Sequence, residues 1–197
     1  MNEDQFAQLL YQALEAELSG VEVYQAALRC VQNDDLREQW RKYHEQTEQH
    51  VEIVKGVLNA FGLDPTVEMP GRNVVQHISA SLVVAMEMAL ADGSREDAEL
   101  VAAECVTLAE TKDHLNWELM GEGAKHVKGD RGRALREALN EVEGEEDEHL
   151  YYTAGWVREL WIESLGLPSV LPPPEERKDV KTAIGASRAK QDRSDMT

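Results

Sequence analysis

The sequence predicts an all-α protein in which four long helices form two antiparallel hairpins and one shorter helix crosses between the hairpins. Apolar residues recur at steps of three and four over long segments, which is the spacing of one face of a helix. Glycine and proline gather between these segments, and no segment alternates convincingly in the manner of a half-buried strand. With 197 residues, the chain is long enough for one sizeable core and does not require two domains.

The first hairpin is predicted from two long segments with helical periodicity. Its helices cover residues 3–31 and 34–61, because apolar residues recur along both at helical spacing. The segment 62–71 contains several glycine and proline residues, which interrupt helices, so it is predicted to be the loop that ends this hairpin.

The second half of the chain begins with a shorter apolar helix, predicted over residues 74–91. Asp92, Gly93 and Ser94 then interrupt the helical pattern. Either Asp92 or Ser94 is suited to cap the next helix, because its side chain accepts hydrogen bonds from free backbone N–H groups. That helix is predicted over residues 95–122.

The last helix is predicted over residues 133–165. The segment 128–132 before it carries two glycines and is interpreted as a turn, and Gly166 and Pro168 close the helix. The helical bundle is therefore expected to cover residues 1–168.

A tail of different composition follows at residues 169–197. It is rich in proline and charged residues and has few large apolar residues, so it cannot build a core and is predicted to be disordered. A segment of this kind can still carry a docking peptide for a partner protein.

The charge of the chain is strongly negative, with 38 acidic and 20 basic residues and a formal net charge of −18. This sign argues against a nucleic-acid partner and against binding to an anionic membrane surface. It suits the binding of cations, although a solvated acidic surface accounts for most of these charges.

The expected compartment is the cytoplasm. The N-terminal residues lead directly into a helix without the pattern of a signal peptide, and no apolar run reaches the roughly 18 residues of a membrane span. Cys30 and Cys105 lie in separate helices without the spacing of metal ligands. We interpret them as small apolar residues in a reducing compartment.

Polar residues interrupt the apolar stripes of three long helices. The interruptions are Glu17 in the first helix, Thr47 and His50 in the second, and Glu146 and His149 in the last. Burying an unpaired carboxylate costs several kcal/mol, so the fold must supply a cation, a proton or water at these points. The three stripes are Phe6, Leu10, Ala13, Glu17, Gly20, Tyr24, Ala27, Val31; Leu36, Trp40, Tyr43, Thr47, His50, Val54, Val57, Phe61; and Leu135, Leu139, Val142, Glu146, His149, Thr153, Trp156, Leu160.

The helix over residues 95–122 has two neighbouring stripes, and a broad buried face can use both. The first places Glu110 and His114 near the bundle axis, and the second is more apolar but includes Lys112. The stripes are Leu100, Ala103, Thr107, Glu110, His114, Trp117, Gly121 and Val101, Cys105, Leu108, Lys112, Leu115, Leu119.

The polar interruptions are expected to meet at one level of the bundle. Each lies near the midpoint of its helix, and helices about 40 Å long, at a rise of roughly 1.5 Å per residue, pack with their midpoints together. A carboxylate- and imidazole-rich layer suits iron or manganese, and zinc to a lesser degree, whereas no thiolate stands nearby for softer metals. Buried water or a tyrosine hydroxyl such as that of Tyr24 is the alternative partner for Glu17 and Glu146.

These positions resemble the ferritin-like carboxylate proteins, which include bacterioferritin, rubrerythrin and stress-related ferritin-like proteins. That family binds two metal ions with a Glu from each of two helices and a Glu-x-x-His from each of the other two. The resemblance covers about residues 3–165, and the stretch from His50 to Pro65 also looks like the end of the family's second helix. The pairs that carry it are Glu17 with Tyr24, Glu110 with Trp117, and Glu146 with His149.

One position departs from the family pattern. Thr47 stands three residues before His50, where the pattern has a Glu, so the count of carboxylates falls from four to three. Glu48 is rotated by about 100° around the helix and Glu45 lies farther off, so neither replaces the missing carboxylate without a shift in register.

A residue of the third long helix is expected to take the vacant ligand position. His114 lies one turn after Glu110 on the same stripe and is the first candidate, and the neighbouring Asp113 is the second.

The resemblance implies a metal centre with two irons, with manganese or zinc as alternatives, and a function in iron oxidation or oxidative-stress response. The family also stores iron, reduces peroxide and carries out hydrocarbon chemistry, and the fold does not choose among these activities. The predicted metal ligands are Glu17, His50, Glu110, His114, Glu146 and His149.

A second hypothesis is a degenerate ferritin-like bundle that holds one metal ion or none and acts as a structural, partner-binding or encapsulated cargo protein. The loss of Glu at position 47 favours it. In the tail, the segment Ala183 to Ser187 is faintly like the short C-terminal tags that load ferritin-like cargo into encapsulin shells. A homodimer and a docking partner for the tail are further partner hypotheses.

Overall fold

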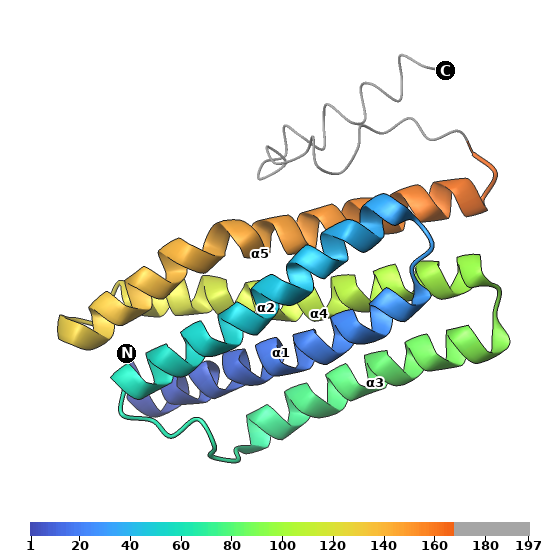
Figure 1. The fold of residues 1–197 in the computed structure, drawn as a ribbon. Helices are drawn as coiled ribbons and strands as arrows, with labels where there is room; N and C mark the ends of the chain where they lie inside the picture. Colours follow the sequence, from blue (N-terminus) through green and yellow to red (C-terminus); the bar gives the residue numbers. More distant parts are fainter. Residues whose placement is uncertain (168–197) are drawn as a thin grey trace.

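A computed structural model describes residues 1–167, and this part of the chain is all-helical, with five α-helices and no strand (Figure 1). The predicted all-α class is therefore confirmed. The predicted tail, with the segment Ala183 to Ser187, lies outside the described residues, so its disorder and docking role remain predictions. The helices are α1 (Glu3–Cys30), α2 (Asp34–Ala60), α3 (Pro70–Asp92), α4 (Arg95–Ala124) and α5 (Gly129–Ser164).

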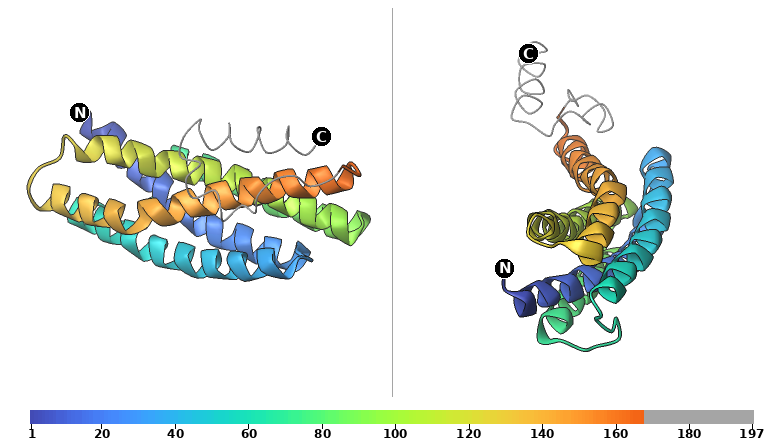
Figure 2. Two further views of the ribbon diagram at one scale, coloured as in Figure 1. Left: turned by 90° about the horizontal axis from the view of Figure 1, so that it is seen from above. Right: turned by 90° about the vertical axis from the view of Figure 1, so that its left-hand side faces the viewer.

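Four of the helices form a ring in which each packs against the next, in the order α1, α2, α5, α4. Helices α1 and α2 run antiparallel to each other, as do α4 and α5 (Figure 1). Helix α3 lies outside this ring, where it packs against α1 and α4 (Figures 1 and 2). In sequence it links the first hairpin to the second. It is longer than the sequence predicts, and it connects one end of the bundle to the other.

Three helices begin at residues whose side chains cap free backbone N–H groups. Asn2 accepts a hydrogen bond from the backbone of Gln5 at 3.1 Å, and Asn33 accepts one from Leu36 at 3.0 Å. Ser94 caps α4, and its backbone and hydroxyl are paired in turn with the Asp97 carboxylate. Of the two predicted caps for this helix, Ser94 is the one used.

Helix α3 begins four residues earlier than predicted, at Pro70. Proline and glycine at this point predict a loop, but proline fits the first turn of a helix, where its missing N–H is not needed. Gly71 lies against α1, since a Cβ atom on it would stand 2.8 Å from the Gln12 side chain. This glycine permits close helix packing and does not interrupt α3.

Helix α5 also begins four residues earlier than predicted, at Gly129, whose φ of 68° suits glycine alone among common residues. The predicted turn is therefore mostly the first turn of the helix. Gly132 is buried, and a Cβ atom on it would lie 2.3 Å from the Val127 carbonyl oxygen. Its small size lets the chain fold closely against the end of the α4–α5 connection.

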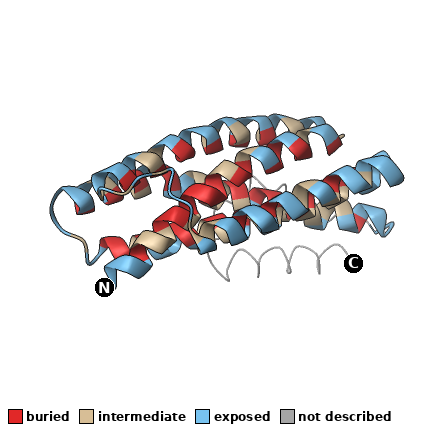
Figure 3. Ribbon diagram, turned by 90° about the horizontal axis from the view of Figure 1, so that it is seen from below, coloured by how far each residue is buried: buried red, intermediate tan, exposed pale blue. Residues whose placement is uncertain are grey.

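Buried residues lie on the faces that the helices turn toward one another (Figure 3). The apolar ones among them form two clusters, one toward each end of the bundle. The first includes Trp40, Tyr43 and Met86, and the second includes Leu10, Met120 and Leu135. Along every long helix of the ring, buried polar residues lie between the members of the two clusters. These residues are Glu17, Thr47, His50, Glu110, Asp113, Asn116, Glu146 and His149.

The predicted use of both stripes on α4 is wrong. Leu108, Leu115 and Leu119 of the second stripe are 60%, 46% and 45% exposed. The buried face instead turns toward the opposite side, where Ala102 and Val106 are fully buried, because α4 packs against α3 as well as against α1 and α5. The periodicity of one helix does not contain the position of the crossover helix, so it does not predict the edge of this face.

Helix α3 is apolar, yet much of it is exposed, including Val74, Ile78, Val84 and Met88. By length and composition alone it is sufficient to cross a membrane, with a mean hydropathy of 1.6 in a window of which 11% is buried. The prediction that no apolar run reaches the length of a membrane span is therefore wrong for this helix. Single polar residues interrupt its apolar run, but its mean hydropathy stays in the range of a membrane-spanning helix. One such helix is weak evidence of a membrane span, and the absence of a membrane partner remains a prediction.

Candidate metal centre

Five of the six predicted ligands lie together in the polar layer of the bundle. Glu17 comes from α1, His50 from α2, Glu110 from α4, and Glu146 and His149 from α5. Each is at most 4% exposed. The predicted convergence of helix midpoints thus brings carboxylates and imidazoles from all four helices of the ring to one place.

Two groups of side chains are close enough to hold a metal ion. His50, Glu146 and His149 form the first group, and Glu17, Asp113 and Glu146 form the second. In each group one ligand atom per residue lies within 4.8 Å of those of the others. Glu146 belongs to both groups, so a single carboxylate stands between two potential metal positions.

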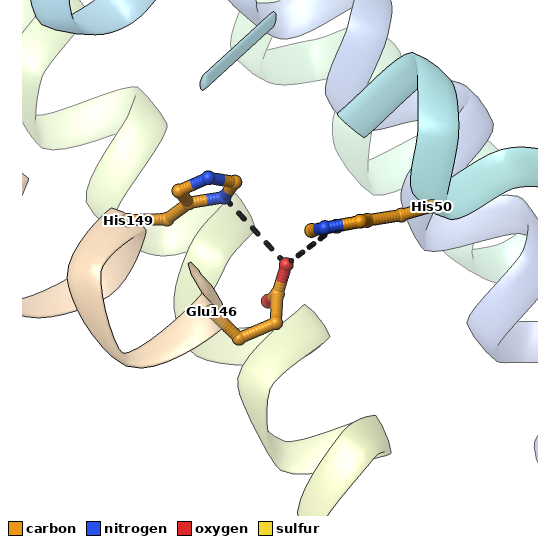
Figure 4. Close-up of side chains that lie close together, drawn as sticks. All are labelled: His50, Glu146 and His149. Atoms are coloured by element: carbon orange, nitrogen blue, oxygen red, sulfur yellow. Dashed lines mark ion pairs between the residues drawn. The ribbon is translucent and has the colours of Figure 1, made fainter. Parts of the chain in front are cut away.

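Both histidines direct Nδ1 toward this carboxylate (Figure 4). Oε1 of Glu146 lies 3.1 Å from Nδ1 of His50 and 3.6 Å from Nδ1 of His149. Each imidazole also has a second carboxylate nearby: Glu17 Oε2 lies 3.6 Å from Nδ1 of His50, and Glu110 Oε2 lies 3.7 Å from Nδ1 of His149. The arrangement is approximately symmetric about Glu146.

Apart from the ion-pair contacts that they make with one another, the atoms that face one another in this layer lack hydrogen-bond partners among the described residues. Buried polar atoms are nearly always paired, and leaving one unpaired costs about 1–3 kcal/mol or more. Six such atoms in one place therefore point to a missing cationic partner. They are Oε2 of Glu17, Nδ1 of His50, Oε2 of Glu110, Oδ1 of Asp113, Oε2 of Glu146 and Nδ1 of His149.

Nε2 of each histidine points away from the centre of the layer and is hydrogen-bonded to a side chain at the edge of the layer. Nε2 of His50 donates to the Glu145 carboxylate at 2.8 Å, and Nε2 of His149 donates to the amide oxygen of Gln46 at 3.1 Å. Hydrogen bonds of this kind fix the ring and its tautomer and leave the other nitrogen for a metal. Glu145 directly precedes Glu146, and Gln46 directly precedes Thr47. A polar residue next to a polar stripe position is therefore the sequence signal for such an outer partner.

Burial in the layer favours the neutral form of the carboxyl groups. It raises the pKa of Glu146 to about 7, with the charge of Glu17 adding to the effect while His50 opposes it. Burial and the nearby charge of Glu146 raise the pKa of Glu110 well above its usual range. Burial also raises the pKa of Asp113, and among the neighbouring charges that of Glu17 adds most to this effect. These shifts have a common cause, which is that several carboxyl groups are buried close together.

The two histidines respond in opposite directions. Burial opposes the charged form of His50, but the carboxylates of Glu146 and Glu17 outweigh it and raise its pKa to about 11. Burial and the positive charge of His50 lower the pKa of His149. One imidazole thus acts as the cation of the metal-free layer, and the other is neutral and ready to donate a lone pair.

The donor set fits divalent metal ions. The four carboxylates Glu17, Glu110, Asp113 and Glu146 carry four negative charges when ionised, which two divalent cations neutralise. Carboxylate oxygens with imidazole nitrogens suit iron, manganese or zinc. Buried Cys30 and Cys105 are free thiols that belong to neither group, in agreement with their prediction as small apolar residues.

His114 lies beside this layer and not among the two groups. Its Nε2 is 3.0 Å from Oδ1 of Asp147, and its side chain is 14% exposed. The neighbouring Asp113, which the sequence analysis ranked second, is buried and belongs to the group with Glu17. Successive residues of a helix are rotated by about 100° around its axis, so the rotation of α4 determines which of Asp113 and His114 points into the layer.

Thr47 supplies no carboxylate, and no residue of α2 replaces it. Its hydroxyl donates to the Tyr43 carbonyl oxygen at 2.9 Å, and its methyl group would lie 3.1 Å from a Cβ atom on Gly20. Glu45 and Glu48 are exposed, as their positions around the helix predict. The indole of Trp117 is a further partner of the layer, since it donates to Glu17 at 2.8 Å.

The outer hydrogen bonds give a first testable prediction. Glu145→Ala removes the acceptor for His50, so we expect metal affinity to fall by roughly 10–100-fold, the usual effect of losing such a partner. Competition against a chelating dye measures the change. Glu141→Ala is the matched control, because Glu141 is an exposed residue of the same helix outside the layer. Equal affinity in the two variants would contradict this function for Glu145.

Comparison of the chain with protein-family models, with curated proteins and with solved structures gave no match. The resemblance to ferritin-like proteins therefore rests on the residues quoted for it and stays an expectation from the sequence.

Proposed function

We propose that this protein is a metal-binding helical bundle of the ferritin-like kind that holds two metal ions, iron being the favoured metal, in the layer around Glu146. The observation that carries the proposal is the membership of Glu146 in both ligand groups. A carboxylate shared in this way is what a two-ion centre needs. The unpartnered buried atoms around it supply the remaining ligands.

The proposed ligands are six of the eight buried polar side chains of the layer, with Asp113 in place of His114. Asp113 is 6% exposed and has an unpartnered Oδ1, whereas His114 is paired with Asp147. Two bound irons supply redox chemistry toward oxygen or peroxide, which is the basis for proposing a function in iron oxidation or oxidative-stress response. The proposed ligands are Glu17, His50, Glu110, Asp113, Glu146 and His149.

The experiment that tests this function is a count of bound metal. The full chain is stripped with a chelator, loaded with Fe(II) under argon, desalted and analysed by plasma mass spectrometry. We expect two ions per chain. Absence of bound iron, together with absence of bound Mn(II) and Zn(II), would refute the proposal.

A bundle that holds one ion is the second candidate, and Thr47 favours it. The family pattern has a carboxylate at this position. Here the side chain is a threonine, and its hydroxyl donates a hydrogen bond to the Tyr43 carbonyl oxygen of the same helix. A count of one ion per chain, with no Fe(II) oxidation, would support this candidate and a structural or partner-binding function.

A pair of neighbouring substitutions tests which residue of α4 is a ligand. Asp113→Asn removes a buried carboxylate of the second group, so we expect the metal count to fall from two ions to one. His114→Gln changes a residue outside both groups, so the equilibrium count should stay at two. Metal analysis after equilibrium loading measures both. The reverse pattern would show that His114 is the ligand.

A further inference from the structure

The space between α4 and α5 forms a half-open groove of about 780 Å³ that reaches the metal centre from outside. Its inner wall includes Glu146 and Trp117, which are 1% and 3% exposed. Trp117 is in turn hydrogen-bonded to Glu17. The groove therefore ends on a carboxylate of the layer and on the indole that holds a second one.

Three other cavities do not reach the layer. They lie beside Arg72, beside Arg131 and beside Arg95, have volumes of about 230, 400 and 140 Å³, and include no residue of the two ligand groups. The α4–α5 groove is larger than each of them.

The charged side chains of the groove are mainly acidic. Glu118, Glu143 and Asp147 line it together with Glu122. Its two cations lie toward the α4–α5 connection, where Lys125 is paired with Glu122 at 2.6 Å.

Arg136, the second of these cations, donates to the carbonyl oxygens of Ala124 and Val127 at 3.4 Å. The end of the groove nearer the layer thus carries net negative charge. Low-dielectric walls with one sign of charge concentrate ions of the opposite sign, so this end attracts cations.

An independent observation shows where a cation entering the groove would be bound. Oε2 of Glu146 is buried and has no hydrogen-bond partner among the described residues, although Glu146 forms part of the groove wall. A buried carboxylate oxygen without a partner requires a proton or a cation. The groove thus leads from solvent to a residue that carries an unsatisfied ligand atom, which a merely solvated acidic surface does not do.

The pair of His114 and Asp147 spans the groove between the two helices, 3.0 Å apart. Their side chains are 14% and 18% exposed, so solvent reaches both. In sequence they adjoin Asp113 and Glu146, two members of the second ligand group, of which Glu146 lines the groove. One imidazole and one carboxylate make a weak divalent-cation site, from which an ion can leave again.

We propose that the α4–α5 groove is the route by which a divalent metal ion reaches the centre, and that His114 and Asp147 form a transit site on its wall. This inference rests on the proposed metal-binding function. In this proposal His114 binds the metal ion during uptake but is not one of its final ligands. The acidic groove raises the rate of binding, and the six buried side chains determine how many ions stay bound.

The rate of Co(II) uptake tests the route. The chelator-stripped full chain is mixed with Co(II) in a stopped-flow instrument, and ligand-field absorption reports binding. In the double variant Glu143→Gln, Asp147→Asn we expect uptake to slow by about 10-fold or more, the lower range of electrostatic effects on association rates. Its rate should also depend less on added NaCl, while two Co(II) ions still bind at equilibrium.

Two further variants separate the effect of the groove from that of the overall acidic charge. Asn140→Trp narrows the groove from its exposed wall without changing charge, and it should also slow uptake. Glu137→Gln removes an acidic charge from the exposed surface of α5 outside the groove, and it should leave the rate unchanged. Wild-type rates in both groove variants, with two ions bound, would overturn the route. Failure of the wild-type chain to bind Co(II) as well as Fe(II), Mn(II) and Zn(II) would instead refute the proposed function itself.

Discussion

Replacing Glu146 with glutamine is expected to remove both metal ions from the protein. Glu146 is the member common to the two ligand groups, and its Oε1 faces Nδ1 of both His50 and His149. Glutamine keeps the size of the side chain but removes its negative charge and one ligand oxygen. Loss of a shared ligand should reduce affinity by more than the roughly 10–100-fold that follows loss of an outer hydrogen-bond partner.

The measurement is metal content after loading and desalting, with circular dichroism to show that the variant is helical. Glu141→Gln is the control with the same chemical change at an exposed position of α5. We expect two ions in the control and almost none in Glu146→Gln. If the variant retains two ions, Glu146 is not the shared ligand and the proposed centre is wrong.

The stability of the metal-free protein is expected to fall as pH rises from about 6.5 to 8.5. The pKa of His50 is raised from 6.5 to about 11, so its stabilising contribution is complete below 6.5 and is lost as pH rises toward 11. The raised pKa of Glu146, about 7, acts in the same direction between 4.5 and 7. His149, whose pKa is lowered, opposes the trend only below 6.5.

The size of this effect is about 1 kcal/mol per pH unit for each proton taken up on folding, which is a measurable change in melting temperature. Metal binding needs deprotonated ligands, so affinity increases with pH and the metal-loaded protein should show the opposite trend. Thermal melts at several pH values, with and without Co(II), check both statements.

Changes at the layer separate its contribution from that of the acidic surface. His50→Gln should flatten the pH dependence of the metal-free protein, because glutamine does not titrate. Glu48→Gln, at an exposed position of the same helix, should leave it unchanged. A melting temperature of the metal-free wild-type protein that rises with pH over this range would contradict the assignment of protons in the layer.

The sequence was sufficient to predict the helices and most of the layer. Periodicity places each apolar stripe, so a polar residue within a stripe is predicted to be buried, and those in the stripes of α1, α2 and α5, such as Glu17 and His50, all are. Helix ends were less predictable, since Pro70 and Gly129 start helices although their residue types suggest loops. Glycine and proline have different effects at the first turn and in the middle of a helix.

The error on α4 had a physical origin of another kind. Its stripes depend on which helices surround it, and the contact with α3 turns the buried face toward Asp113 and away from Leu108. A rotation smaller than one residue step is enough to exchange Asp113 for His114 at the layer. Pattern reasoning on a single helix does not contain this information, because it lies in long-range packing.

The division of the core into two apolar clusters affects how the bundle moves. The clusters hold the helices together toward each end, whereas the layer between them contributes paired charges and unpartnered atoms in place of apolar contacts. Opening at the middle of the bundle therefore exposes less apolar surface than opening at either end. A metal pair bridged by Glu146 would act as a cross-link at this weak point, so that loading would convert two loosely coupled halves into one cooperative unit.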